Sequence, residues 1–299
     1  MSSVPESRAA ARELSGRELA AEIRAATAAR AADLTAAGRP PRLAVVTATA
    51  DEASVWYVRS LARTAVKAGI ALDVTDLVPA APDRPASQEA TVAGIRVALT
   101  TLSGDPGVHG ILLQTPLPGG ARLAELASFI DPAKDVDGAN PVSLGRLMTG
   151  LPAFAPATAA AVLALLDHYQ VALSGRRAVV VGRSAVVGKP VAQLLIGRDA
   201  TVTVCHSRTV DLASVTREAE VLVVAAGRAG LIGPGHVARG AVVIDVGTNA
   251  TPDGGMAGDV DPAVAGVAGA LSPVPGGVGP VTTAVLLRNV TDAAAGSGG

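Results

Sequence analysis

Short apolar runs alternate along the chain with longer, alanine-rich stretches whose polar positions recur at helical spacing. The apolar runs are brief and rich in valine, which is typical of strands that are buried on both faces of a parallel sheet. The predicted strands are Leu43–Thr47, Leu72–Leu77, Gly110–Gln114, Ala178–Val181, Thr201–Cys205, Val221–Ala225 and Ala241–Asp245.

The stretches between these runs predict helices. They are Gly16–Ala36, Ser54–Ala68, Gln88–Leu102, Thr158–Tyr169 and Lys189–Ile196. Strands that alternate with helices favour doubly wound sheets with right-handed crossovers. The predicted fold class is therefore α/β, with two α/β domains, the second of them Rossmann-like with a mostly parallel sheet.

A break near Thr149–Pro152 marks the predicted domain boundary. The length of 299 residues is itself that of about two domains. We predict a first domain over residues 1–150 and a nucleotide-binding domain over residues 151–279. A C-terminal helix within about 280–299 is expected to pack back on the first domain, and the Ala/Gly/Ser-rich tail, 293–299, is expected to be disordered.

Composition narrows the class of protein. Apolar residues make up 49% of the chain but aromatic residues only 2%, so the core must be aliphatic. Mean hydropathy is +0.41, yet no apolar run reaches the roughly 20 residues of a membrane-spanning helix. Residues Met1–Arg12 contain no apolar signal region, and the single cysteine, Cys205, excludes an intrachain disulfide. We therefore expect a cytoplasmic protein.

Charge argues against two classes of partner. The net charge of -1 does not favour binding to nucleic acid or to an anionic membrane surface. No metal site is predicted either. The expected ligands are small molecules.

The segment Ser272–Pro280 is the most unusual loop of the chain. Its prolines stiffen the backbone, its glycines leave the backbone bare, and it leads directly into the apolar, helix-like segment Val281–Leu287. Such a loop at a helix N-terminus lets a flat or anionic ligand approach the backbone. The alternative is an ordinary tight turn, which is what most Pro/Gly clusters form.

A second unusual loop, Gly182–Pro190, follows a predicted strand and precedes a predicted helix. Strand, glycine loop and helix in this order form the phosphate-binding arrangement of Rossmann folds. Ser184 stands where the second glycine of the G-x-G-x-x-G pattern would be, so the general fingerprint is met only in part.

The residues after the next strand indicate which dinucleotide is bound. A site specific for NAD carries an acidic residue about 20 positions beyond the glycine loop, where it holds the ribose 2′-hydroxyl. Here the strand Thr201–Cys205 is followed by His206-Ser207-Arg208-Thr209, without an acid, and Arg183 lies in the glycine loop. Cations and hydrogen-bond donors suit a 2′-phosphate, so NADP is predicted. The alternative is a solvated basic turn.

Several motifs occur together in order along the chain. They are Leu14-Ser15-Gly16-Arg17, Ser54 with Tyr57-Val58, Gly110–Gln114 with Pro116-Leu117-Pro118, Lys134–Gly138, Gly182–Pro190, Cys205-His206-Ser207, Asp245–Gly247, Gly258–Val260 and Pro273–Pro280. With them the chain resembles the bifunctional methylenetetrahydrofolate dehydrogenase/methenyltetrahydrofolate cyclohydrolase family, from Leu14 to about Val290.

The resemblance implies a protomer of two domains with a cleft between them, assembled as a homodimer. It also implies that the first domain binds tetrahydrofolate one-carbon derivatives. The implied activity is oxidation of 5,10-methylenetetrahydrofolate with NADP, followed by hydrolysis of the methenyl product to 10-formyltetrahydrofolate.

The resemblance also implies roles for individual residues. Tyr57 would stack on the folate rings, and Gln114 and Asp137 would be catalytic or folate-binding polar residues. The residues lining the cleft would be Pro275, Gly276, Gly277 and Val278. The residues holding NADP would be Gly182, Arg183, Ser184, Gly188, His206, Ser207, Arg208, Gly227, Asp245 and Gly247. Considered singly, Tyr57 could be a core aromatic, Gln114 a backbone cap and Asp137 part of a turn.

Leu61 is the main departure from the family pattern Tyr-Val-x-x-Lys, because it occupies the position of the catalytic lysine. Residues i and i+4 share a helix face, so Leu61 keeps the position beside Tyr57 but lacks the amine. Arg59 and Arg63 lie two positions away, about 200° around the helix, and Lys67 is also off this face.

The two family reactions depend differently on that amine. Hydride transfer mainly requires positioning, whereas hydrolysis of the methenyl group requires proton transfer by a group of tuned pKa. We therefore predict a dehydrogenase with impaired cyclohydrolase activity. The alternatives are a specialised paralogue that uses a folate one-carbon unit in another pathway, and a folate- or NADP-binding protein without turnover.

Overall fold

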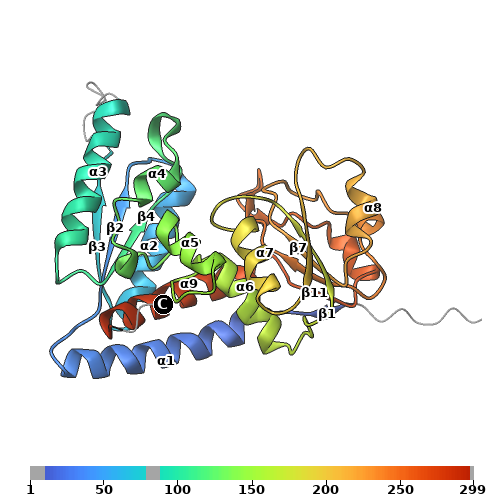
Figure 1. Ribbon diagram of the computed structural model, residues 1–299, viewed down its shortest axis with the longest axis horizontal. Helices are drawn as coiled ribbons and strands as arrows, with labels where there is room; N and C mark the ends of the chain where they lie inside the picture. The colour runs from blue at the N-terminus through green and yellow to red at the C-terminus, as the bar shows by residue number, and fades with distance from the viewer. Residues whose placement is uncertain (1–10, 79–87, 297–299) are drawn as a thin grey trace, which may run out of the picture. The chain divides into compact units, whose positions relative to one another are not determined.

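The computed structural model describes residues 11–78 and 88–296, and these form two compact units (Figure 1). Residues 11–19 and Thr158–Val281 form one, which we call the six-stranded unit. Ala20–Ala157 and the residues from Thr282 onward form the other, the three-stranded unit. The polar N-terminal segment before residue 11 and the tail from 297 lie outside the described residues.

The three-stranded unit is built on a parallel sheet with the strand order β3-β2-β4. The strands are β2 (Arg42–Thr47), β3 (Ala71–Asp76) and β4 (Gly110–Leu113). Apolar side chains of β2 and β4 are buried, whereas β3 is an edge strand with mostly exposed or half-buried residues. The buried pattern of β2 and β4 explains why their runs of valine, leucine and isoleucine are continuous rather than alternating.

Helices surround this sheet. They are α1 (Arg17–Ala36), which begins in the other unit, α2 (Glu52–Lys67), α3 (Gln88–Gly104), α4 (Leu123–Ala127), α5 (Pro141–Met148) and α9 (Val278–Ala294), which belongs to this unit from Thr282. α2 packs against β3, and α3 packs against β2 and β4. α2 begins where the Asp51 carboxylate accepts the Ser54 N–H at 2.9 Å, an ordinary helix N-cap.

The six-stranded unit has the strand order β1-β11-β8-β7-β5-β6, and every neighbouring pair is parallel. The strands are β1 (Arg12–Glu13), β5 (Arg177–Val181), β6 (Thr201–Cys205), β7 (Val221–Val224), β8 (Val242–Asp245) and β11 (Ala270–Leu271). The chain passes from β5 to β6 on one side and then to β7 on the other. This reversal is the switch point at which open α/β sheets bind ligands.

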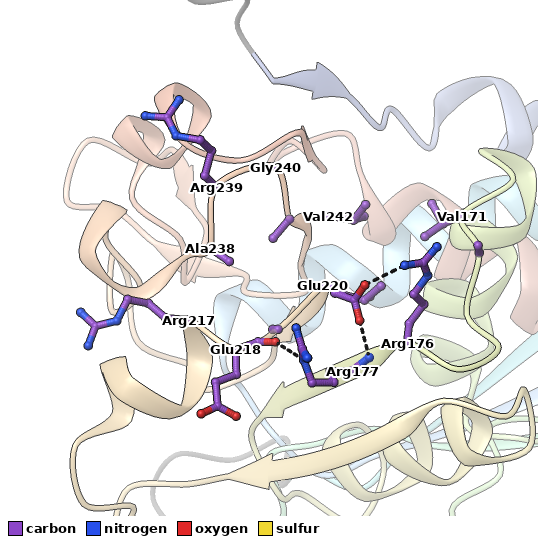
Figure 2. A pocket seen from close by; sticks show the side chains of 14 residues that line it. Val171, Arg176, Arg177, Arg217, Glu218, Glu220, Ala238, Arg239, Gly240 and Val242 are labelled. Atoms are coloured by element: carbon purple, nitrogen blue, oxygen red, sulfur yellow. Dashed lines mark hydrogen bonds and ion pairs between the residues drawn. The ribbon is translucent and has the colours of Figure 1, made fainter.

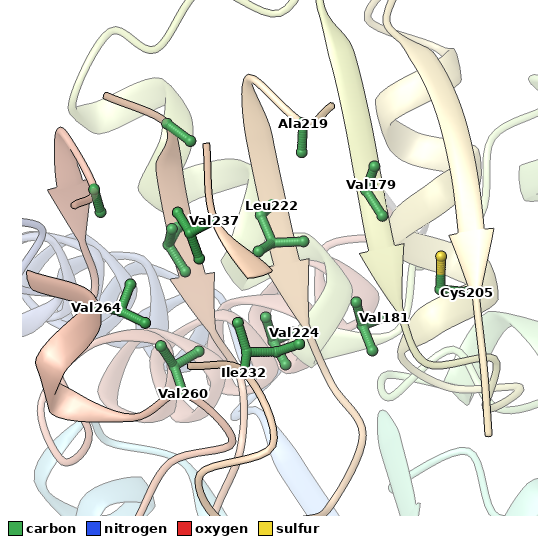
Figure 3. Close-up of a cluster of buried hydrophobic side chains, with 13 residues drawn as sticks. Val179, Val181, Cys205, Ala219, Leu222, Val224, Ile232, Val237, Val260 and Val264 are labelled. Carbon is green, nitrogen blue, oxygen red and sulfur yellow. The ribbon is translucent and has the colours of Figure 1, made fainter. Parts of the chain in front are cut away.

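In the described part of the chain, the sheet of this unit is accompanied by three α-helices and a small two-stranded sheet. They are the helices α6 (Ala157–His168), α7 (Gly188–Ile196) and α8 (Leu212–Thr216), and the antiparallel pair β9 (Asn249–Ala250) and β10 (Met256–Ala257). One face of the sheet is buried in an aliphatic cluster that includes Val179, Leu222 and Val243, with Cys205 at one side (Figure 3). The aliphatic core predicted from the scarcity of aromatic residues is thus found here.

The α/β fold class predicted from the sequence is confirmed, and each predicted strand lies within a residue or two of an observed one. Three features differ from expectation. Ala293 and Ala294, expected in a disordered tail, belong to α9. Residues 11–19 group with the second half of the chain rather than with the first 150 residues, because β1 pairs with β11. The pair β9 and β10 was not expected.

None of the helices in the described ranges combines the length and the apolar character that crossing a membrane requires.

Candidate functional site

The loops that follow β5, β6 and β7 meet at Gly182. The Gly182 N–H donates to the Cys205 carbonyl oxygen at 2.9 Å, and the Ala225 N–H donates to the Val181 carbonyl oxygen at 2.7 Å. A Cβ atom at Gly182 would overlap the Ala225 carbonyl oxygen, and the φ of +136° also requires glycine. The carboxyl ends of three strands are therefore in contact at the switch point, where the sequence predicted a phosphate-binding loop.

Ser184 supports the start of α7. Its hydroxyl oxygen accepts the Val187 N–H at 3.2 Å and the Gly188 N–H at 3.3 Å. A Cβ atom at Gly188 would overlap the carbonyl oxygen of Gly182, so the helix begins directly against the loop. The serine in place of the second fingerprint glycine thus has a local function, and its hydroxyl keeps a hydrogen that it can donate to a ligand.

The predicted cations lie on the same edge. Arg183, Ser207 and Arg208 are exposed after β5 and β6, and His206 is half-buried. The Nδ1 atom of His206 accepts the Arg208 N–H at 3.2 Å, which fixes this short turn. The edge thus presents two guanidinium groups and several hydroxyl and N–H donors, and the first five residues after β6, 206–210, include no acidic side chain. This donor set fits a phosphate-bearing dinucleotide.

Asp245, predicted to hold the cofactor, is buried and has internal partners. Its carboxylate accepts N–H groups from Gly247 at 2.9 Å, Asp259 at 3.0 Å and Val260 at 3.0 Å. A Cβ atom at Gly258 would overlap one of its carboxylate oxygens. Burial raises the pKa of Asp245, and the three N–H donors oppose that rise. Asp245 and Gly247 therefore support the backbone from within.

Asp259 was not singled out from the sequence, although it lies in one of the motifs quoted there. Its fully buried carboxylate accepts the N–H groups of three consecutive residues, Ala226 at 2.6 Å, Gly227 at 2.8 Å and Arg228 at 2.8 Å. The Nδ2 atom of Asn249 donates to it at 2.9 Å. The predicted cofactor residue Gly227 thus lies in a loop that Asp259 holds in place.

The Pro/Gly loop after β11 is fixed at several points within the six-stranded unit. Ser272 Oγ accepts the Asp245 N–H at 2.8 Å, and the Gly277 N–H donates to the Pro273 carbonyl oxygen at 2.8 Å. The Gly16 N–H donates to the Gly276 carbonyl oxygen at 2.8 Å. The backbone here is rigid, as expected from its composition, and part of its support comes from the other end of the chain.

The other predicted residues of this loop differ in exposure. Pro275 is exposed, whereas Gly276, Gly277 and Val278 are buried, and Val278 is the first residue of α9. Of the four residues predicted to line a ligand site, Pro275 alone offers an exposed side chain in this unit.

In the three-stranded unit, Tyr57 and Asp137 come together. Tyr57 of α2 is hydrogen-bonded to the side chain of Thr283 in α9. The Asp137 carboxylate is close enough to Tyr57 to interact with it electrostatically. Burial, followed by the nearby Asp137 carboxylate, raises the pKa of Tyr57, so its phenol stays protonated. Tyr57 and Asp137, which are far apart in the sequence, thus lie in one site.

Asp137 has an unusual acidity. Burial and the neighbouring Asp135 carboxylate raise its pKa to about 7, although the Ala157 N–H donates to it. Asp135 is fully buried and accepts the N–H groups of Ala139 at 3.0 Å and Asn140 at 2.8 Å. At neutral pH, Asp137 can therefore exchange a proton, which is a common property of functional carboxyl groups.

The turn at Asp137 is tightly held. Gly138 has a φ of +61°, and a Cβ atom there would lie 2.5 Å from the Pro156 nitrogen. The turn interpretation of Asp137-Gly138 is thus also correct, because a turn presents the carboxyl group. Gln114 follows β4 and is half-buried, and its Nε2 atom donates to the Thr115 carbonyl oxygen at 2.8 Å.

Leu61 lies on the buried face of α2. It is 1% exposed and shares this face with Ser54, Val58 and Ala65. Tyr57, one turn earlier, is half-buried at the border of this face. The side chain at the position of the family lysine is therefore a core leucine.

A hollow in the six-stranded unit lies elsewhere. It has a volume of about 480 Å³ and lies at the amino ends of β5, β7 and β8, where Arg176, Arg177, Arg217 and Arg239 line it (Figure 2). Glu220 is paired there with Arg176 at 2.8 Å. The predicted cofactor residues follow the carboxyl ends of the strands, so none of them lines this hollow. No group of acidic, histidine or cysteine side chains within residues 11–78 and 88–296 is arranged to hold a metal ion.

Comparison with known families accounts for nearly the whole chain. Residues 14–137 match the family description "Tetrahydrofolate dehydrogenase/cyclohydrolase, catalytic domain", and residues 156–297 match its "NAD(P)-binding domain". The chain therefore belongs to the tetrahydrofolate dehydrogenase/cyclohydrolase family. It is an enzyme of this family with an NAD(P)-binding domain, as the resemblance predicted.

Individual relatives agree with this assignment. Bifunctional protein FolD 1 of Saccharopolyspora erythraea is 60% identical over 99% of both chains. The bifunctional FolD enzyme of Campylobacter jejuni has a similar solved structure, with a TM-score of 0.89 and 37% identity over 96% of this chain and 99% of that one. The FolD structure of Trypanosoma brucei, complexed with NADP cofactor and inhibitor, has a TM-score of 0.87 and 35% identity over 97% of this chain and 99% of that one.

Proposed function

We propose that this protein oxidises 5,10-methylenetetrahydrofolate to 5,10-methenyltetrahydrofolate with NADP, and that it hydrolyses the methenyl product poorly. The observation that carries the second half is Leu61, a fully buried leucine at the position of the family lysine. The first half is supported by the family and by the donor-rich edge of the six-stranded unit.

NADP is favoured over NAD by the residues after β5 and β6. Arg183 and Arg208 are exposed at the ends of these strands, and residues 206–209, which directly follow β6, include no acidic side chain to hold a ribose 2′-hydroxyl. The Trypanosoma brucei relative was solved with NADP. The dinucleotide would supply the hydride acceptor, and the residues that would hold it are Gly182, Arg183, Ser184, Ser207 and Arg208.

The folate is assigned to the three-stranded unit. The Tyr57 ring offers an apolar face, and the Asp137 carboxyl group can accept hydrogen bonds from N–H groups of a heterocycle or donate one when protonated. Gln114 adds an amide that follows β4. We assign substrate positioning to these three residues.

No lysine of the three-stranded unit can replace the missing amine. Lys134 caps the C-terminal end of α3, where its Nζ atom donates to the Ser103 carbonyl oxygen at 2.8 Å and to the Asp105 carbonyl oxygen at 2.6 Å. Lys67 is exposed in the last turn of α2, ten residues beyond Tyr57, and Lys189 belongs to the other unit.

Within the three-stranded unit, histidine offers no replacement either. His109 is the one histidine in the sequence of residues 20–157, and it directly precedes β4, whereas Gln114 follows that strand. Loss of a general acid or base typically lowers a rate by a factor on the order of 10²–10⁴. We expect a loss of this size in hydrolysis, while hydride transfer continues because it depends mainly on positioning.

The test measures both reactions in the unchanged protein. With NADP and methylenetetrahydrofolate, NADPH and the methenyl product are expected to accumulate together. With methenyltetrahydrofolate alone, decay is expected to stay close to the uncatalysed background. Catalysed decay at ordinary enzymatic rates would overturn the proposal for hydrolysis, and absence of NADPH would overturn the proposal for oxidation.

A pair of variants tests the cause. Leu61→Lys restores an amine one turn from Tyr57 and is expected to raise methenyl hydrolysis by a factor on the order of 10²–10⁴. Leu61→Met is the matched control, because it has an unbranched side chain without charge. A similar rise in both variants would mean that shape, rather than the amine, limits hydrolysis.

The homodimer is a further part of the proposal and is supported by the family resemblance. Light scattering of the purified protein is expected to give twice the mass of one chain. The cytoplasmic location stays a prediction from the sequence.

A further inference from the structure

The loop Ala226–Arg228 follows β7 at the switch point of the six-stranded sheet. Ala225, just before it, contacts Gly182 in the glycine loop, so the two loops share one edge. The backbone N–H groups of Ala226, Gly227 and Arg228 all point to one place. Consecutive N–H groups in this arrangement form a concave anion-binding site, often called a nest.

The anion in this nest is the protein's own Asp259 carboxylate. Its three bonds to the loop are 2.6–2.8 Å long, and Asn249 Nδ2 adds a fourth at 2.9 Å. Asp259 is fully buried, so these donors replace the water that a carboxylate would otherwise bind. The shape of the loop therefore depends on this carboxylate.

Asp259 is itself held from behind. The Asp259 N–H donates to the Asp245 carboxylate at 3.0 Å, and the Val260 N–H donates to the same carboxylate at 3.0 Å. At Gly247, a Cβ atom would lie 2.6 Å from the carboxyl carbon of Asp259, so the glycine leaves room for this side chain. Asp245 is anchored in turn to Ser272, at the start of the Pro/Gly loop.

We propose that Asp259 is a positioning residue for the dinucleotide, because it shapes the Ala226–Arg228 loop and presents the exposed Arg228 side chain at the carboxyl edge of the sheet. This inference rests on the proposed NADP site. Arg228 would add a third guanidinium group to Arg183 and Arg208 on that edge. A sequence search for cofactor residues misses Asp259, because it contributes no atom to the ligand surface.

Two roles of Asp259, shaping the loop and acting only as a negative charge, predict opposite changes in NADPH affinity when the carboxylate is neutralised. If Asp259 acted only as a negative charge near a phosphate ligand, its neutralisation would strengthen NADPH binding. If it shapes the loop, Asp259→Asn keeps only one acceptor oxygen and places an NH2 group where the other oxygen lies, so at least one of the three N–H groups loses its acceptor, and binding weakens. We expect the Kd for NADPH to rise about tenfold or more.

The experiment is a fluorescence titration of NADPH, without folate, on the full-length protein. Asp253→Asn is the matched control, since Asp253 is an exposed aspartate after β9 in the same unit. We expect an unchanged Kd for the control. In turnover, the KM for NADP should rise in Asp259→Asn while the KM for the folate substrate stays within about twofold of the unchanged protein.

Two further variants keep the test decisive if Asp259→Asn folds poorly. Asn249→Ala removes one donor to Asp259 and is expected to raise the Kd for NADPH about threefold. Asp259→Ala vacates the nest, and formate, a carboxylate small enough to enter it, is expected to restore part of the affinity. Chloride at equal ionic strength is expected to restore none.

The outcomes are separable from those of the proposed function. If the unchanged protein does not bind NADPH, the proposed NADP site is wrong. If it binds NADPH but Asp259→Asn and Asn249→Ala bind equally well or more tightly, the role of Asp259 is wrong.

Discussion

Each unit contains a pair of neighbouring aspartates, and the two pairs are used differently. In the six-stranded unit, Asp245 and Asp259 are both buried, and each carboxylate accepts three backbone N–H groups. In the three-stranded unit, the buried Asp135 carboxylate accepts two backbone N–H groups, whereas Asp137 is half-buried and has a pKa raised to about 7.

The two kinds of aspartate differ in how many N–H groups donate hydrogen bonds to the carboxylate. Several N–H groups around a buried carboxylate compensate its charge and fix the surrounding backbone, so such a residue acts as a scaffold. A carboxyl group with fewer donors and a raised pKa retains bonding capacity for a ligand. The comparison thus indicates that Asp245, Asp259 and Asp135 hold the backbone in place, whereas Asp137 is available to a ligand.

The largest expected effect is on stability in Asp245→Asn. An amide cannot accept three N–H groups in the geometry of the carboxylate, so buried donors lose their partners. We expect the free energy of unfolding to fall by about 3 kcal/mol or more, measured by urea denaturation. Asp253→Asn, at an exposed site, should change it by less than about 0.5 kcal/mol. Equal effects in the two variants would contradict the scaffold role.

Gly258→Ala tests the same scaffold without removing charge. The added Cβ atom would overlap the Asp245 carboxylate and displace it. We expect a loss of about 2 kcal/mol, as for other overpacked sites. Gly233→Ala is the control, because nothing lies within 4 Å of the added atom and its φ of -97° suits alanine. A neutral effect of Gly258→Ala would show that the carboxylate is not confined.

Asp137→Asn is expected to affect the substrate rather than the fold. Losing a charged hydrogen-bond partner should raise the KM for methylenetetrahydrofolate about 10–100-fold, while the Kd for NADPH and the unfolding midpoint at pH 7 stay near those of the unchanged protein. Asp131→Asn is a fitting control, since Asp131 caps a short helical turn and asparagine caps equally well. A large loss of stability in Asp137→Asn would place this residue with the scaffold aspartates.

The smallest effect is a pH dependence of stability. The pKa of Asp137 is raised from 3.8 to about 7, so the folded chain binds this proton more tightly than the unfolded chain. The proton therefore stabilises the folded state at low pH, and this contribution is lost as pH rises from about 4 to 7. Asp137→Asn should remove the loss and gain on the order of 1 kcal/mol relative to the unchanged protein between pH 5 and pH 8. A pH-independent difference would contradict the raised pKa.

Sequence patterns predicted the features that depend on local or periodic order. The valine-rich run of β5 and the glycine loop after it were identified from the sequence, and the i, i+4 relation of Tyr57 and Leu61 placed both on one helix. The two-residue strand β1 could not be predicted, because Arg12–Glu13 has no apolar pattern and is defined by its partner alone.

Roles that depend on distant partners were also not predictable. The sequence assigned Asp245 to the cofactor, but its donors come from residues up to 15 positions further on, so its scaffold role emerges only in the folded chain. The same holds for Asp259, whose loop lies 31–33 positions earlier. The sequence also did not predict that the Leu61 side chain is almost fully buried, with 1% of its surface exposed.

Because β1 pairs with β11, the six-stranded sheet can be completed only late in synthesis of the chain. Arg12 and Glu13 leave the ribosome early, but their partners Ala270 and Leu271 follow on the order of 10–50 s later at ordinary elongation rates. The sheet of the three-stranded unit already has all its strands once Leu113 has emerged. A fragment that begins at Thr158 would lack β1 and leave β11 as an open edge. To fold alone with a complete sheet, the six-stranded unit therefore needs residues 11–19 as well, which a circular permutation could supply after residue 281.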